Sequence, residues 1–95
     1  MIAQKSIPGY PGYIARSDGI ICGKRRGYML KQTSDKFGRP TVVISINGRY
    51  EKYQVARLIA KTFIPNPNNY WFVTHIDGNV ANNSVENLKW TKLII

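Results

Sequence analysis

The chain has 95 residues, a mass of 10.8 kDa and 43% hydrophobic residues, which fits one compact domain and excludes a large multidomain enzyme. Its single cysteine, Cys22, excludes an internal disulfide framework and a cysteine-cluster zinc site, as suits a reducing cytoplasm. The net charge is +9, and twelve of the fourteen basic residues lie before residue 62. This concentrated positive charge favours a polyanionic partner, with nucleic acid as the first candidate and an anionic membrane surface as the second.

The first third of the chain predicts turns and short strands. Residues 7–13 contain two Pro-Gly pairs, which exclude a helix there. Residues 13–15 and 20–22 flank the turn residues 17–19, Ser-Asp-Gly, and this pattern predicts a β-hairpin. A further short strand is expected at residues 28–32.

A second hairpin and a helix are predicted in the middle of the chain. Residues 40–46 are rich in β-branched side chains, and Asn47-Gly48 suits a type I′ turn, so residues 49–52 should return as the paired strand. In residues 55–63 the apolar positions follow helical spacing instead. We expect this helix to end before Pro65, which cannot continue it.

The last third predicts two strands joined by a polar loop. Residues 70–74 are aromatic and β-branched, residues 75–84 are polar, and residues 85–91 resume an extended apolar pattern. No apolar run approaches the roughly 18 residues of a membrane span, so we interpret the protein as soluble and intracellular.

Several motifs in this order resemble one family. The stretch His75-Ile76-Asp77-Gly78-Asn79, the pair Asn82-Asn83 and the stretch Glu86-Asn87-Leu88-Lys89-Trp90 resemble the core of phage-type HNH homing endonucleases. Residues 55–67 resemble the segment before that core, and residues 9–19 are similar to a short DNA-binding module at the N-terminus of these nucleases.

The resemblance implies an α+β fold. Small antiparallel hairpins and one central helix would precede an HNH ribbon of the ββα-metal type that lacks its final helix. We expect one compact domain over residues 1–95, with a basic, β-rich DNA-binding part at 1–52 and the HNH-like core at 53–95.

The family motif also implies roles for individual residues. In these nucleases the ribbon and a following helix clasp one divalent metal ion, Mg²⁺ or another, beside a histidine that activates water for attack on a phosphodiester. The resemblance makes His75 this general base and Asn87 the asparagine that positions the loop. An imidazole is suited to the first role because its pKa lies near neutrality.

The chain departs from the family at the metal ligands. Thr74 occupies the position of one ligand, and a neutral hydroxyl is a poor substitute for the carboxylates that Mg²⁺ sites usually recruit. The sequence reaches Ile95 before the helix that would present the other ligand, and Asp77 is only a weak alternative ligand. We therefore interpret the chain as a nuclease scaffold with a degenerate site.

The basic residues supply the candidate DNA contacts, and the large apolar side chains the candidate core. Arg49, Lys52, Arg57 and Lys61 either extend the phosphate contacts or solvate the helix and hairpin. The predicted contacts themselves are Arg16, Lys24, Arg25, Arg26, Lys31, Lys36 and Arg39. The predicted core includes Phe63, Trp71, Phe72, Leu88 and Trp90.

Three functions remain open from the sequence. The first is a double-stranded-DNA-binding protein derived from an HNH homing endonuclease, encoded by a phage, located in the bacterial cytoplasm, and inactive or weakly active as a nuclease. The second is a metal-dependent DNA nickase or endonuclease. The third is an inhibitor of a host protein that handles nucleic acid, bound through an apolar edge at Trp90 and residues 93–95, an edge that also suits self-association.

Overall fold

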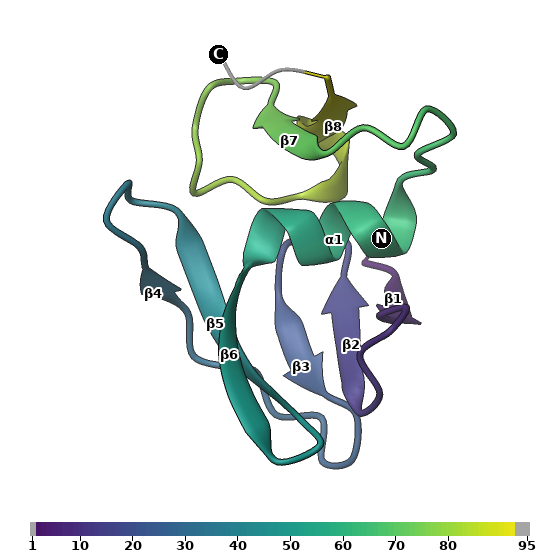
Figure 1. Ribbon diagram of the computed structural model, residues 1–95, viewed down its shortest axis with the longest axis vertical. Coiled ribbons are helices and arrows are strands. Elements are labelled where there is room, and N and C mark those ends of the chain that lie inside the picture. Colours follow the sequence, from purple (N-terminus) through teal and green to yellow (C-terminus); the bar gives the residue numbers. More distant parts are fainter. Residues whose placement is uncertain (1, 93–95) are drawn as a thin grey trace.

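The structure is a computed structural model that describes residues 2–92. Three small antiparallel sheets surround one helix, so the predicted α+β class is confirmed (Figure 1). The elements in chain order are β1 (Gln4–Ser6), β2 (Tyr13–Arg16), β3 (Ile21–Gly23), β4 (Thr33–Ser34), β5 (Pro40–Ile46), β6 (Arg49–Gln54), α1 (Val55–Phe63), β7 (Phe72–His75), the 3-10 turn η1 (Val85–Asn87) and β8 (Leu88–Thr91).

The first sheet has the order β1-β2-β3 and contains the predicted hairpin. Strand β2 pairs antiparallel with β3 in the register Ile14 to Cys22, and Gly19 closes the turn with φ of +93°. Strand β1 was not predicted, because its three residues are polar and exposed and show no apolar alternation. Cys22 is buried, as expected for a small apolar side chain.

The second sheet has the order β4-β5-β6 and contains the second predicted hairpin. Val42 and Ile44 are buried while Val43 is 47% exposed, which is the alternation of a half-buried strand. Asn47 and Gly48 have φ of +52° and +79°, as a type I′ turn requires.

The strand predicted at residues 28–32 is wrong. That segment makes a single bridge, from Met29 to Cys22, and the paired strand of the region is β4. The ring of Tyr28 packs so close to Gly23 that a Cβ there would lie 2.4 Å from a ring carbon. The segment therefore pairs with β3 at one position only, and the chain then continues to β4 in the second sheet.

Helix α1 lies between the first two sheets and the β7–β8 ribbon (Figure 1), over the range that the sequence predicts. Its buried residues Leu58 and Ile59 belong to one hydrophobic cluster together with side chains of all three sheets, including Ile21, Ile44 and Leu88. Burial of such side chains contributes about 1.5–3 kcal/mol each, so α1 holds the three sheets together.

The β7–β8 ribbon differs from its prediction at both strand starts. Strand β7 begins at Phe72 and includes His75, and residues 85–87 form η1, so β8 begins only at Leu88. Leu88 is buried, as predicted, but the prediction of a buried Trp71 is wrong because this side chain is 70% exposed. It precedes β7 and lies over the side chain of Arg57 instead of entering the core.

Two further predictions concern the end of the chain and its relation to membranes. The apolar edge predicted at residues 93–95 lies outside the described residues. Within residues 2–92, no helix has the length and apolar character needed to cross a membrane.

Candidate functional site

His75, the predicted base, is the last residue of β7, where it pairs with Leu88 of β8. Its Nε2 lies 2.6 Å from Oδ1 of Asn83. Because an amide oxygen only accepts hydrogen bonds, Nε2 carries the proton, and in the neutral ring Nδ1 keeps its lone pair. The ribbon thus presents an imidazole whose Nδ1, which has no hydrogen-bond partner within residues 2–92, has the character of a base.

Asn83 is held in place by the turn between β2 and β3. Its side chain is 4% exposed, and a Cβ on Gly19 would lie 3.1 Å from the carbonyl carbon and oxygen of Asn83. The backbone N–H of Val85 also donates to the carbonyl of Ser17, at 2.9 Å. The N-terminal hairpin therefore supports the residue that orients His75. In the sequence Asn83 belongs to the family motif, but no individual role is predicted for it.

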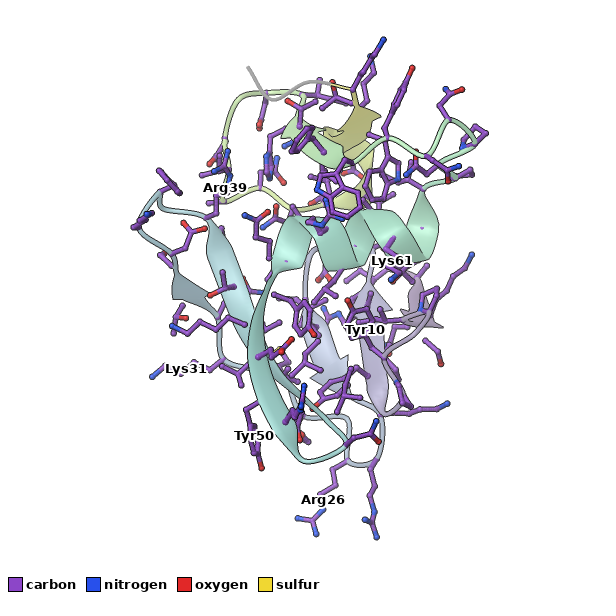
Figure 2. All side chains as sticks on the ribbon, viewed as in Figure 1. Tyr10, Arg26, Lys31, Arg39, Tyr50 and Lys61 are labelled. Carbon is purple, nitrogen blue, oxygen red and sulfur yellow. The ribbon has the colours of Figure 1, made fainter. Side chains whose placement is uncertain are left out.

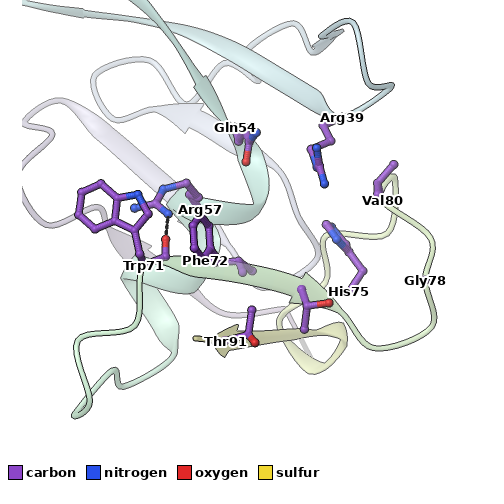
Figure 3. A pocket seen from close by; sticks show the side chains of 11 residues that line it. Arg39, Gln54, Arg57, Trp71, Phe72, His75, Gly78, Val80 and Thr91 are labelled. Atoms are coloured by element: carbon purple, nitrogen blue, oxygen red, sulfur yellow. Dashed lines mark hydrogen bonds between the residues drawn. The ribbon is translucent and has the colours of Figure 1, made fainter. Parts of the chain in front are cut away.

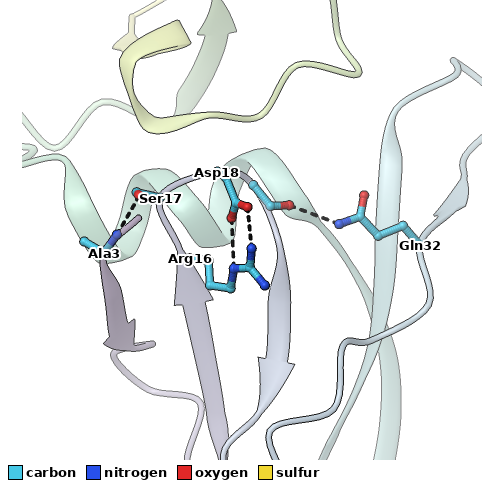
Figure 4. A network of polar contacts seen from close by, with 6 residues as sticks. Ala3, Arg16, Ser17, Asp18 and Gln32 are labelled. Atoms are coloured by element: carbon cyan, nitrogen blue, oxygen red, sulfur yellow. Dashed lines mark hydrogen bonds and ion pairs between the residues drawn. The ribbon is translucent and has the colours of Figure 1, made fainter. Parts of the chain in front are cut away.

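The tip of that hairpin is itself fixed by polar contacts (Figure 4). The guanidinium of Arg16 donates two hydrogen bonds to Asp18, with Nη2 2.5 Å from Oδ2. Gln32 donates to the carbonyl of Gly19 at 3.0 Å, and the hydroxyl of Ser17 accepts from Ala3 at 2.9 Å. Arg16, a predicted DNA contact, thus has a carboxylate partner within the protein.

Asn87, the predicted loop-positioning residue, links the two sides of the loop that follows β7. Its Oδ1 accepts from the backbone N–H of Asp77 at 3.0 Å, and its Nδ2 donates to the Asp77 carboxylate and the Asn82 carbonyl, both at 2.9 Å. The side chain is 7% exposed. These three bonds close the loop.

The carboxylate of Asp77 is the acceptor at the centre of the same loop. The backbone N–H of Asn79 and the side-chain amides of Asn82 and Asn87 donate to it and lower the pKa of Asp77 below its ordinary value. Since both carboxylate oxygens already accept from the loop, Asp77 serves the loop's own structure.

The described residues do not fit the divalent-metal site that the family motif implies. Thr74 is exposed beside His75 and offers a neutral hydroxyl, while the oxygens of Asp77 are engaged within the loop. Nowhere in residues 2–92 do three or more His, Cys, Asp or Glu side chains gather as a metal-binding group. A hard divalent cation prefers carboxylate oxygens, and those of Asp77 already accept hydrogen bonds from the loop.

A hollow of about 460 Å³ opens beside His75. We call it the His75 hollow; its lining includes Arg39, Gln54, Arg57, Thr74, His75 and Val80. Figure 3 shows Arg39, from the segment before β5, directed toward His75 across this space. No aspartate or glutamate is among the described residues that line the hollow, so its walls are cationic.

The structure separates the remaining predicted DNA contacts. Arg39 lies at the His75 hollow, whereas Arg26 lies at the opposite end of the molecule, beyond the first two sheets (Figure 2). Lys24 and Arg25 share the turn of Arg26, Lys31 precedes β4, and Lys36 lies in the turn between β4 and β5. These five are exposed. Only Arg39 of the predicted contacts therefore lines the space next to the candidate base.

Comparisons with known proteins identify relatives of this chain, although no family model matches it. It is 42% identical over 78 residues to an uncharacterized HNH endonuclease of Acanthamoeba polyphaga mimivirus, covering 82% of this chain and 24% of that protein. It is 33% identical over 87 residues to the DNA endonuclease I-HmuI of Bacillus phage SP01, covering 90% of this chain and 50% of that one.

A solved structure shares the fold. It describes DNA binding and cleavage by the HNH homing endonuclease I-HmuI, and it matches with a TM-score of 0.83 and 31% sequence identity over 94% of this chain and 52% of that chain. The present chain thus spans about half the length of the phage relative and about a quarter of the mimivirus relative.

Proposed function

This chain is related to the HNH homing endonucleases over about nine-tenths of its length, and on that premise we propose that it binds double-stranded DNA. The observation that carries the proposal is the His75 hollow, which combines Arg39 and Arg57 with the imidazole and has no acidic residue among its described lining. Cationic, concave surfaces of this kind concentrate the field that attracts a phosphate backbone.

Binding to duplex DNA should weaken steeply as salt is raised. Neutralising three or four phosphates gives a slope of about −3 in a plot of log binding constant against log salt concentration, or roughly a 60-fold loss between 50 and 200 mM. Fluorescence anisotropy of a labelled duplex measures this slope. No binding at 50 mM salt, or a slope near zero, would contradict the proposal.

We further propose that these residues support little or no DNA cleavage. Thr74 and the engaged carboxylate of Asp77 leave the site without the ligands that a divalent cation prefers, so the charge that develops on a phosphate during hydrolysis would lack its usual stabilisation. On this proposal His75 lines the DNA-binding hollow as a polar side chain and does not act as a base.

A second candidate function, strand nicking, is favoured by the orientation of His75. Its hydrogen bond to Asn83 leaves Nδ1 free to take a proton from water. A plasmid-nicking assay with Mg²⁺ or Mn²⁺ separates the two candidates when wild type is compared with His75→Ala. Nicking that disappears in His75→Ala supports the nickase; equal traces in both proteins indicate a contaminant.

A further inference from the structure

Arg57, in the first turn of α1, lies against the rings of two tryptophans. Its Nη1 donates to the backbone carbonyl of Trp71 (Figure 3), and its guanidinium carbon lies 5.3 Å from the ring centroid of Trp71 and 5.7 Å from that of Trp90. Such cation–aromatic contacts fix a guanidinium that would otherwise sample many rotamers. The long side chain is therefore already ordered before any ligand arrives.

The charge on Arg57 has no carboxylate partner in the part of the chain that the structure describes. The single ion pair within residues 2–92 joins Arg16 to Asp18. Of the five N–H donors of a guanidinium, the described contacts of Arg57 use one, for Trp71. A fixed, uncompensated guanidinium with free donors is suited to an oxyanion such as phosphate, which it can bind through two parallel hydrogen bonds.

Arg57 also joins two hollows. Together with Gln54 it lines both the His75 hollow and a second hollow of about 70 Å³, whose other walls include Tyr10, Lys61 and Trp90. Lys61 follows Arg57 by four residues, which places the two charges on one face of α1, roughly 6 Å apart along the axis. Its Nζ lies 5.0 Å from the centroid of Tyr10 (Figure 2 labels both).

We propose that Arg57 is a phosphate anchor, and that one DNA strand runs from the His75 hollow past Arg57 to the exposed Lys61 on α1. This proposal rests on the DNA binding proposed above, and it specifies the surface along which the DNA backbone lies. The charge of the two hollows favours a polyanion, since their described linings together contain Arg39, Arg57 and Lys61 but no aspartate or glutamate. The exposed ring of Trp71 then forms an apolar wall on which a sugar or an unstacked base can pack.

The two tryptophans make this path directly observable. They are the only tryptophans of the chain, and both lie against Arg57. A duplex bound along α1 should therefore change the intrinsic tryptophan emission, at the same DNA concentrations at which the anisotropy of a labelled duplex rises. Anisotropy that rises while tryptophan emission stays constant would overturn the α1 path but leave DNA binding itself intact. No rise in anisotropy would remove both.

Variants of the two basic residues give an independent test. We expect Arg57→Gln and Lys61→Ala each to weaken duplex binding about 5- to 20-fold at 100 mM salt and to reduce the salt slope by about 1. Lys61→Ala removes an exposed side chain and should fold normally, so it remains informative if Arg57→Gln is unstable. Thermal unfolding of each variant checks this.

The matched control is Arg49→Ala. It removes the same charge from an exposed position at the start of β6, roughly 17 Å along that strand from Gln54. We expect less than a 2-fold effect on binding. If Arg49→Ala weakens binding as much as Lys61→Ala and folded Arg57→Gln do, binding depends only on the net charge of the protein. The proposal that Arg57 is a phosphate anchor is then refuted.

Discussion

Replacement of Gly19 by alanine should lower the free energy of unfolding by about 3 kcal/mol. An L residue at the φ of +93° found here costs about 1–3 kcal/mol. The new Cβ would also lie 3.1 Å from the backbone carbonyl of Asn83, which is fixed within the fold and cannot give way as the end of a flexible side chain would. Urea unfolding followed by circular dichroism measures the change.

Gly12→Ala is the matched control for Gly19→Ala. Gly12 has nearly the same φ, +90°, but a Cβ there meets no atom within 4 Å. The backbone cost should appear in both variants, and the excess loss in Gly19→Ala, about 1–2 kcal/mol, measures the contact with Asn83. Equal losses of unfolding free energy in the two variants would show that the turn makes no close contact with Asn83. The inference that this turn supports the orientation of His75 would then be wrong.

Asn87→Ala should also lower the free energy of unfolding by about 3 kcal/mol. The side chain makes three hydrogen bonds from a site that is 7% exposed, and each net bond contributes about 1 kcal/mol. Truncation leaves the Asp77 N–H and the Asn82 carbonyl without these partners. Denaturant unfolding measures this loss, and amide hydrogen exchange at Asp77 should quicken in the same variant.

Asn79→Ala provides the comparison for Asn87→Ala. It removes an exposed side chain of the same loop whose Oδ1 accepts one hydrogen bond, from the N–H of Ala81 at 3.0 Å. We expect a loss of about 1 kcal/mol or less. Similar losses in both variants would mean that burial of Asn87 adds nothing, and that the loop is closed by its other contacts.

Local sequence signals predicted most of the fold. The Asn47-Gly48 turn, the alternation in β5 and the helical spacing in α1 depend on residues that are neighbours in the chain, so their patterns are visible in the sequence. Tyr28 and Met29 show the limit. Tyr28 has strand propensity, but the close contact of its ring with Gly23 and the route of the chain toward β4 decide the conformation of both residues.

The site was harder to predict because its decisive contacts join distant segments. A resemblance to a family motif led to His75 and Asn87, but the contact of Gly19 with Asn83 connects the first hairpin with the last loop. Likewise, sequence left Arg57 as either a DNA contact or a solvated helix residue. Its two flanking indoles come from segments that follow the helix, and only the fold places them together.

The contacts of the Ser17–Gly19 turn with the loop after β7 have a consequence for protein engineering. A chimera that exchanges the first hairpin for one of another nuclease would also replace the surface against which Asn83 rests. Transplanted hairpins should therefore be compatible only when they carry a glycine at the equivalent turn position and place a backbone carbonyl within hydrogen-bond distance of the Val85 N–H. Recombination between genes for related nucleases would therefore be constrained at the contact between the first hairpin and the loop after β7, as well as at the helix.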